Sequence, residues 1–516
     1  MNKWANVFKD DLWKFEEATK QFFAKEIKPN DYKTKALGFG AVGERGANSI
    51  MIRLRFTGGT ITKEELEALA SIVEDFQLNM LHFTTGQTFQ FHHLGPDKAI
   101  PLMRAIYDRG LVSRGSGSDY PNNVTAPSLR GFTKDEYFDL GNIPDVANDY
   151  LLGKINHLSL PRKVKTAFSN GPSTDSLVRF RDMGFVGRLD GLFDFFTLGG
   201  IGPNPQIGVK TAEAIEPADI LYYIEAFLQT YVSLADFKAR SRNRSRYLQK
   251  SPGLDTYLER FGQELAKVYE KDLSYTFEPT KIRTISPNDT EVLVDTKQQP
   301  RIHKQKQDGL YYVTYHPLGG MISGQEFLAF AKTVLAIDGA LVRLGGEETL
   351  YIANLTTEEA LAVNKVTASS GTTAFERSVA CVGSKTCQIG VRDSQELLAS
   401  ILEAARPYQF ADGVLPQIYI SGCSNSCGTH EIGELGFHGF VKLVDKKPQA
   451  AFSLHFGGSE HLGTEKFGQQ MGVLLTEDIP SFIIDLGKAV SLSGLTFTEW
   501  IKGHTNDFQD LLKPYL

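Results

Sequence analysis

Ser421-Gly-Cys-Ser-Asn-Ser-Cys-Gly428 is the most informative segment of this chain for its fold, because it carries two of only four cysteines in 516 residues. The other two lie in Ala380-Cys-Val-Gly-Ser-Lys-Thr-Cys387. The pairs have the spacings C-x5-C and C-x3-C, with 35 residues between Cys387 and Cys423. Four thiolates are the ligand set of a cubane iron–sulfur cluster or of tetrahedral zinc. The nature of this site therefore decides what the chain does.

The residues around the cysteines favour an iron–sulfur cluster. Glycine and other small residues let the backbone wrap closely round a bulky cluster and point amides at its sulfides. Zinc sites more often use C-x2-C or C-x4-C spacings. Two disulfides would be few for a chain of this length, and no export signal opens it. We therefore expect a cluster, with zinc or unliganded thiols as the remaining alternatives.

Composition describes a globular protein of about two to four domains. Apolar residues make up 41% and charged residues 22%, which is ordinary for a chain that buries a large core. The first 28 residues lack the apolar segment of a signal peptide, and no run of eighteen apolar residues follows. We therefore expect a soluble, cytoplasmic protein that does not associate with membranes. A net charge of −6 argues against nucleic-acid binding but is compatible with a small anion held by local basic residues.

The chain contains an internal repeat. A shift of 261 residues places Gly58-Gly59 on Gly319-Gly320, and the match runs without a gap from about residue 51 to 94. Each copy is predicted to hold a β-rich run, a Gly-Gly turn, a helix and a second β-rich run. Each helix is predicted to begin at a capping box, Thr62-x-x-Glu65 or Ser323-x-x-Glu326. The β-rich runs are 49–56 and 80–92 in the first copy, and 310–316 and 340–354 in the second.

A second pair of segments matches at a shift of 255, where residues 160–170 align with 415–425. The two matches predict an α+β protein of two related units, each with two subdomains, packed about a pseudo-two-fold axis. Ligands favour the crevice between such domains. The cysteines occur only in the second copy, whereas the first copy carries Lys163 and Lys165. Because these lysines are two residues apart, they share one face of a strand.

Together these motifs resemble the sirohaem-dependent nitrite and sulfite reductase family of the ferredoxin type. The resemblance covers about residues 35–490, and it implies the internally duplicated fold of that family, with two ferredoxin-like half-domains and two larger α+β domains that hold sirohaem and the cluster. It rests on the cysteine pairs, the Ser-Gly-Cys-x-Asn-x-Cys-Gly core, Leu160-Pro-Arg-Lys-Val-Lys165 and Thr84-Thr-Gly-Gln-Thr-Phe-Gln-Phe-His92.

The resemblance also predicts domain boundaries. The predicted parts are 1–112 for the first half-domain with its N-terminal extension, 113–235 for the first α+β domain, 236–300 for a linker, 301–365 for the second half-domain, 366–490 for the α+β domain with the cysteines, and 491–516 for a C-terminal helix.

In that family a [4Fe–4S] cluster sits beside sirohaem, and the resemblance implies both cofactors here. It implies that Cys381, Cys387, Cys423 and Cys427 hold the cluster, and that Cys427 also bridges to the sirohaem iron. The implied reaction is the six-electron reduction of sulfite to sulfide or of nitrite to ammonia. Lysine and arginine side chains then offset the charge of the anion and supply protons as its oxygens leave as water.

By position, the resemblance makes Arg53, Lys163 and Lys165 the cations of the anion pocket. Taken alone, Arg53 can be a solvated strand residue and the lysines a charged strand edge, while a lone histidine is more often a core residue than a ligand. The residues predicted to bind sirohaem are His82, Thr84, Gln90, His92, Asn425 and Cys427.

Three positions depart from the family pattern. Gly86 and Asn122 stand where the family has arginine, and His82 stands where it has arginine or histidine. In the family, the first arginine binds a sirohaem carboxylate and the second belongs to the substrate pocket. Breaking such a buried pair costs about 3–5 kcal/mol. The alternatives are that Arg55, Arg130 or Arg162 compensates, that the tetrapyrrole binds differently, or that the substrate differs, as in a hydroxylase of a tetrapyrrole precursor on the same scaffold.

No Gly-x-Gly-x-x-Gly opens a strand–helix unit, so we expect a separate electron donor such as ferredoxin or a flavoprotein. The basic residues between Lys238 and Lys250 either dock that donor or form a structural ion network. A third interpretation of the whole chain is non-enzymatic: an iron–sulfur or zinc protein with a decayed haem site.

Overall fold

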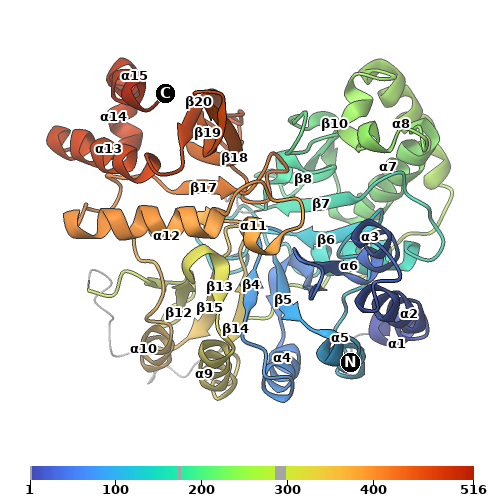
Figure 1. The fold of residues 1–516 in the computed structure, drawn as a ribbon. Helices are drawn as coiled ribbons and strands as arrows, with labels where there is room; N and C mark the ends of the chain where they lie inside the picture. Colours follow the sequence, from blue (N-terminus) through green and yellow to red (C-terminus); the bar gives the residue numbers. More distant parts are fainter. Residues whose placement is uncertain (1–2, 173–175, 285–297) are drawn as a thin grey trace. The chain divides into compact units, whose positions relative to one another are not determined.

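The computed structural model describes residues 3–172, 176–284 and 298–516, and it divides into two compact units. The first unit comprises residues 1–200, 205–315 and 322–368, and the second comprises 201–204, 316–321 and 369–516. The described residues form four five-stranded sheets (Figure 1). Each sheet is covered by helices, as the α+β prediction requires.

Two of the sheets are copies of each other and correspond to the ferredoxin-like half-domains. Their strand orders are β1 (Ala41–Gly43), β2 (Ile50–Arg55), β5 (Thr88–Leu94), β4 (Leu81–Phe83) and β13 (Met321–Ile322), and β11 (Ile302–Lys304), β12 (Tyr311–Tyr315), β15 (Leu350–Leu355), β14 (Leu341–Leu344) and β3 (Thr60–Ile61). Each copy thus gives its two-residue strand to the sheet of the other copy. In the second sheet, β3 pairs with β14 through Ile61 and Val342.

The helices of the two copies also correspond. Helices α4 (Lys63–Asp75) and α9 (Gly324–Leu335) begin at the two predicted capping boxes, in which the N-cap hydroxyl and the N3 carboxylate each bind the amide of the other residue. They lie side by side in Figure 1, and Phe327 of α9 packs 5.4 Å from Phe89 of the first sheet. The remaining helices around these sheets are α1 (Lys3–Lys9), α2 (Leu12–Phe23), α3 (Pro29–Ala36), α5 (Pro96–Asp108) and α10 (Thr357–Val366).

The Gly-Gly turn is a geometric requirement of the strand exchange. Gly59 has φ +73°, which favours glycine, and a Cβ there would lie 2.2 Å from the Leu344 carbonyl oxygen. The first glycine of each pair also has the same left-handed conformation, with φ +51° at Gly58 and +56° at Gly319. The duplicated glycines therefore mark a duplicated backbone.

The other two sheets are also a matched pair. Their strand orders are β6 (Pro121–Thr125), β7 (Val164–Ser169), β8 (Met183–Gly187), β9 (Phe193–Thr197) and β10 (Val209–Ile215), and β16 (Val379–Ala380), β17 (Ile418–Ser421), β18 (Leu435–Val444), β19 (Lys447–Phe456) and β20 (Gln469–Leu475). In both sheets the first two pairings are parallel and the last two antiparallel. The chain is therefore internally duplicated throughout.

Separate helices cover these two sheets. Buried aromatic and aliphatic residues form one core under the β6–β10 sheet and another under the β16–β20 sheet. The helices are α6 (Ile143–Lys154), α7 (Ile220–Leu234) and α8 (Leu254–Val268) on the first, and α11 (Gly383–Thr386), α12 (Ser394–Ala405), α13 (Ile479–Ser493), α14 (Phe497–Gly503) and α15 (Thr505–Leu512) on the second.

Strand register corrects the second sequence match. Thr166 pairs with Met183, and Ile418 pairs with Leu435. Both members of the second pair lie 252 residues after those of the first, so the strands correspond at a shift of 252 and not 255. The sequence match was three residues out of step because two short coincidences, Leu-Pro and Ser-Asn, determined it.

The corrected register changes where the two sets of site residues lie on their strands. Lys163 and Lys165 lie at the start of β7, whereas Cys423 and Cys427 follow the end of β17. The lysines and the cysteines therefore belong to opposite ends of corresponding strands.

Two segments contain more structure than their predicted descriptions suggest. Residues 236–300, predicted to be a linker, include α8, whose Tyr257 and Phe261 are buried in the core of the β6–β10 sheet. Residues 491–516 contain the end of α13 and two further helices, and Phe497, Trp500 and Phe508 are buried there. No described helix is both long and apolar enough to cross a membrane.

Candidate functional site

All four cysteines lie in the second unit, and the fold brings the two pairs together. Cys381 follows β16, and the one-turn helix α11 separates it from Cys387. Cys423 and Cys427 lie in the loop after β17, which is the strand next to β16. The thiols are close enough to shift each other's pKa: Cys427 acts on Cys381, and both Cys427 and Cys387 act on Cys423.

Hydrogen-bond donors surround the cysteine sulfurs. The Gly422 amide donates to Cys381 Sγ at 3.1 Å, and the Asn425 side-chain amide donates to Cys423 Sγ at 3.3 Å. Ser394 Oγ lies 3.2 Å from Cys381 Sγ. Donors aimed at sulfur stabilise thiolates bound to a metal centre. Ser394 was not predicted, because it lies on α12 and no sequence motif links it to the cysteines.

The raised pKa values of the unliganded thiols favour a cationic centre that replaces their protons. Burial, with the charge of Cys427, raises the pKa of Cys381 to about 12, and burial raises the pKa of Cys423. These thiols would therefore hold their protons at neutral pH unless metal ions replaced them. Cys427 is exposed, whereas the other three are half-buried.

Gly428 lets the cysteine loop pack tightly on its strand, since a Cβ there would lie 2.1 Å from the Ile420 carbonyl oxygen. Small residues of this kind let the backbone wrap closely round a bulky centre. Four thiols brought together by such a loop suit a [4Fe–4S] cluster.

A buried polar network in the first unit joins four of the predicted site residues. Gln90 on β5 is paired with Arg53 on β2. With the amide oxygen of Gln90 toward Arg53, that oxygen accepts from Nη2 and Nε at 2.7 and 2.8 Å, and the amide nitrogen donates to His82 Nδ1 and His92 Nε2, both at 3.0 Å. His92 Nδ1 is 2.8 Å from Glu44 Oε1. His92 is therefore a neutral ring whose proton, on Nδ1, faces the carboxylate.

The pKa values in this network agree with that assignment. Burial lowers the pKa of His92, and its hydrogen bond to Glu44 offsets this only in part. Burial alone would raise the pKa of Glu44, but hydrogen bonds from His92 and Ser49 hold it below its usual range. On the other side, His82 Nε2 lies 3.6 Å from Glu348 Oε1. The network is therefore hydrogen-bonded to the Glu44 carboxylate at one end and lies near the Glu348 carboxylate at the other.

Thr84 and Gly86 lie in the turn between β4 and β5. Thr84 Oγ1 is 2.6 Å from Thr88 Oγ1 and accepts from the Gly86 amide at 3.3 Å, so the Thr84 hydroxyl holds the turn together. A Cβ on Gly86 would meet only Thr84 Oγ1, at an ordinary contact distance of 3.7 Å. The turn therefore has room for a side chain at the position where the family carries arginine.

Lys163 and Lys165 lie on one face at the start of β7. Both are half-buried, while Val164 and Thr166 are buried between and beside them. The Asp182 carboxylate accepts a hydrogen bond from the Lys165 backbone amide at 2.9 Å. The alternation places the two lysines on the same side of the strand, as expected.

Arginines surround this end of β7. Arg244 pairs with Asp182 at 2.8 Å, Arg162 pairs with Asp119 at 3.3 Å, and Arg240 pairs with Asp119 as well. Three arginines thus share these two carboxylates, next to the two lysines. This donor set fits an anion or a group rich in carboxylates, which is the character of sirohaem.

The same contacts bear on two of the basic residues between Lys238 and Lys250. Because Arg240 and Arg244 pair with Asp119 and Asp182, these two arginines belong to a structural ion network. Docking of a donor is not needed to explain them.

The candidate replacements for the missing arginines are engaged with the backbone. Arg55 donates to the carbonyl oxygens of Pro121 and Asn122 at 2.8 and 3.0 Å, and burial lowers its pKa to about 9. Arg130 donates to the Gly58 carbonyl at 2.9 Å. Asn122 itself donates to the Gly115 carbonyl at 3.0 Å. Arg55, Arg130 and Asn122 therefore hold loops in place.

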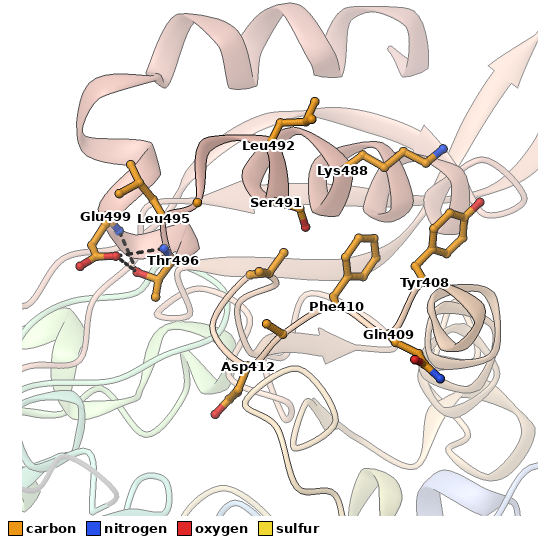
Figure 2. Close-up of a pocket in the computed structure, with 13 residues that line it drawn as sticks. Tyr408, Gln409, Phe410, Asp412, Lys488, Ser491, Leu492, Leu495, Thr496 and Glu499 are labelled. Atoms are coloured by element: carbon orange, nitrogen blue, oxygen red, sulfur yellow. Dashed lines mark hydrogen bonds between the residues drawn. The ribbon is translucent and has the colours of Figure 1, made fainter.

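Figure 2 shows a pocket of about 800 Å³ in the second unit, between α13–α14 and the loop after α12. Tyr408, Phe410 and Leu492 give it an apolar lining, and Lys488 lies at its edge. None of the predicted site residues lines it. The pocket is therefore separate from the candidate site.

Comparisons with known proteins agree with the resemblance of the chain to nitrite and sulfite reductases. Residues 43–108 match the nitrite/sulfite reductase ferredoxin-like half domain, and residues 117–269 match the nitrite and sulphite reductase 4Fe-4S domain. The latter match falls on the first copy, which has no cysteine; all four lie in the second copy.

Curated relatives cover most of the chain. The chain is 26% identical over 435 residues to a ferredoxin–nitrite reductase of Leptolyngbya laminosa, covering 79% of this chain and 80% of that one. It is 26% identical over 444 residues to a sulfite reductase [NADPH] hemoprotein beta-component of Methylobacterium sp. strain 4-46, covering 76% and 70%.

A solved structure shares the fold. The NirA protein of Mycobacterium tuberculosis superposes with a TM-score of 0.74 at 20% identity, covering 95% of this chain and 94% of that one. The residues matched, 43–108 and 117–269, therefore carry two domains of the nitrite and sulfite reductases, and these similarities support a [4Fe–4S] cluster and sirohaem as cofactors.

Proposed function

We propose that this protein reduces sulfite to sulfide or nitrite to ammonia. Sulfur passes from +4 to −2 and nitrogen from +3 to −3, so either reaction consumes six electrons, and protons carry the oxygens away as water. The observation that carries the proposal is the convergence of four cysteine thiols, with N–H donors on the sulfurs of Cys381 and Cys423. Relatives named as nitrite and sulfite reductases support it, and they do not favour a tetrapyrrole hydroxylase or a non-enzymatic protein.

The cysteines would hold the cluster, and Cys427 would also ligate sirohaem. The exposure of Cys427, in contrast to the half-buried state of the other three cysteines, supports this role, because a bridging sulfur must reach a second group. The cluster and the sirohaem supply single-electron transfer and an iron that binds the anion. Gly422 and Asn425 keep their donors on the sulfurs.

Arg53, Lys163 and Lys165 would hold the anion. The two lysines share a face at the start of β7, among arginines that outnumber the nearby carboxylates. Such a field attracts an anion and offsets the charge that builds up as electrons arrive. The lysine ammonium groups are also proton donors for the departing oxygens.

The first-unit network would border the sirohaem. Gln90 and its partners His82 and His92 form a fixed hydrogen-bonded group next to Arg53, and Thr84 holds the turn beside them. Fixed donors of this kind orient carboxylates without reorganisation. On the other unit, Asn425 is the remaining predicted neighbour, and it donates to Cys423.

A separate protein would deliver the electrons. Relatives include enzymes named for ferredoxin and for NADPH, which supports a ferredoxin or a flavoprotein as donor. Because the sequence has no dinucleotide-binding motif, the chain alone is expected to turn over with a reduced dye or ferredoxin and not with NADPH.

Dye-linked turnover tests the proposal. Anaerobically purified protein with reduced methyl viologen should consume about six electrons per sulfite or nitrite, and Lys165→Ala should lower kcat about 100-fold. Lys250→Ala, at an exposed lysine, is the matched control and should leave kcat unchanged. No turnover with either anion would refute the proposed reaction, and full activity of Lys165→Ala would remove that lysine from it.

A further inference from the structure

Three histidines converge in the second unit, outside the predicted site. His430 follows the cysteine loop, His438 lies on β18 and His455 on β19. The ring centroids lie 4.8–5.1 Å apart, and one nitrogen from each ring lies within 4.8 Å of the other two. His430 and His438 are buried, and His455 is half-buried. Among the described residues this is the one group of three or more metal-ligating side chains at this spacing.

The sheet places these rings on one face. His455 is paired with Gly436, and His438 lies two residues further along β18, so the two rings are diagonal neighbours on the same side. Gly436 lets the His430 backbone approach β18 closely, since a Cβ there would lie 2.0 Å from the His430 carbonyl oxygen. The trio is therefore built by the strand register and one glycine.

The hydrogen bonds of the trio leave nitrogens directed at one another. His438 Nδ1 is 3.0 Å from His455 Nε2. His430 Nδ1 is 2.9 Å from Ser421 Oγ, which leaves Nε2 of that ring available as a ligand. A metal-binding histidine is typically held through its other nitrogen in this way. Tetrahedral bonds of about 2.0–2.1 Å place ligand nitrogens about 3.3 Å apart, close to the 3.0 Å between His438 Nδ1 and His455 Nε2.

We propose that His430, His438 and His455 bind a divalent transition-metal ion of the zinc type, at a site separate from the four cysteines. Three imidazoles suit zinc and leave a fourth position for water. Burial lowers the pKa of His430 well below its usual range and that of His438 to about 4, so the rings are neutral, as metal binding requires.

The position of the trio suggests what the ion does. Ser421 Oγ accepts from the Gly428 amide at 3.0 Å and also binds His430, so one hydroxyl joins the trio to the residue after Cys427. The ion would tie β18 and β19 to the cysteine loop. Its role is therefore structural, and it does not depend on the substrate of the enzyme.

Zinc binding to the holoprotein tests this site. Protein with a full complement of cluster iron and sulfide, so that the cysteines are occupied, should take up one equivalent of zinc by equilibrium dialysis and elemental analysis. Zinc K-edge absorption should show a first shell of nitrogen at about 2.0–2.1 Å and no sulfur. No stoichiometric uptake, or a sulfur shell, would overturn the proposal without recourse to any variant.

Variants localise the ion. His438→Gln and His455→Gln should each weaken zinc binding at least tenfold, whereas His461→Gln, at an exposed histidine of the same unit, should not. Iron and sulfide content and circular dichroism show whether each variant is folded. Unchanged zinc affinity in a folded His438→Gln protein would place the ion elsewhere and contradict the site.

Discussion

Asn425 is one of the residues whose side chains contact a cysteine sulfur directly. Its amide donates to Cys423 Sγ at 3.3 Å, and a donor on sulfur stabilises the more negative, reduced cluster. Asn425→Ala should therefore lower the midpoint potential of the cluster by about 40 mV, equivalent to about 1 kcal/mol for one electron. Potentiometric titration measures the shift. Ser424→Ala, at an exposed neighbour, is the control, and an equal shift in both variants would contradict the role of the amide.

Gly86 is the residue at which this chain departs most simply from its family. A Cβ there meets only Thr84 Oγ1 at 3.7 Å, so Gly86→Arg should fold normally. A guanidinium that pairs with a carboxylate of the cofactor should slow the loss of sirohaem about tenfold. The rate of Soret decay in dilute protein measures this, with Gly86→Ala as control. Faster loss than in Gly86→Ala would show that the carboxylate lies elsewhere.

The cysteines could be identified from sequence because they are rare and their spacing is characteristic. The supporting residues could not. Ser394 reaches Cys381 from α12, and the His430–His438–His455 trio depends on strand register and on the small size of Gly436. No local motif encodes such contacts, since they join residues distant in the chain.

The two capping boxes are equivalent elements of the repeat and should have equivalent energies. In α4 and α9 the N-cap hydroxyl accepts from the N3 amide at 3.2 Å. Thr62→Ala and Ser323→Ala should each cost about 1 kcal/mol of stability. Thermal unfolding measures both. A large loss of stability in only one of the two variants would contradict the expectation that both capping boxes contribute equally to the free energy of unfolding.

The β2–β5 network makes the first half-domain sensitive to acid. The folded-state pKa of His92 lies below its unfolded value near 6.5, so the unfolded chain binds the extra proton and stability falls as pH drops below about 6.5. Glu44 has a depressed folded pKa, so its contribution is present above about pH 4.5 and is lost below it.

A His92→Gln variant separates these two terms. It should flatten the fall of the unfolding temperature between pH 6.5 and 5, while the part of the loss below about pH 4.5 that comes from the Ser49 hydrogen bond to Glu44 remains. His157→Gln, at an exposed histidine, should follow the wild-type curve. An unchanged slope in His92→Gln would show that His92 does not stay neutral in the folded protein.

Helix and strand assignments could be predicted where periodicity was strong, as at the capping boxes and the Gly-Gly turns. The exchanged strands β3 and β13 could not, because each has only two residues and its partner lies in the other copy. The shift of 255 between the two copies was wrong for a related reason, because short sequence identities determined it. The pairing of β7 with β8 and of β17 with β18 places the true shift at 252.

At the scale of the whole molecule, the two copies share a topology but carry different functional residues. The second copy of the β6–β10 sheet carries every cysteine, while the first carries Lys163, Lys165 and the arginines around them. The fold is therefore symmetric in backbone and asymmetric in chemistry. Sequence motifs located both the cysteines and the lysines, and strand register was needed to show that they belong to opposite ends of corresponding strands.

Iron and acid-labile sulfide in the anaerobically purified protein decide whether the four cysteines hold a cluster. A [4Fe–4S] cluster with sirohaem predicts about five iron atoms and about four sulfides per chain, with a Soret band and a red chlorin-like band in the absorption spectrum. Cys427→Ser should lose the coupling of the two cofactors, and Ser424→Ala should retain it. Sulfide near zero, with zinc bound to the four cysteines, would contradict the cluster and the reaction proposed for it.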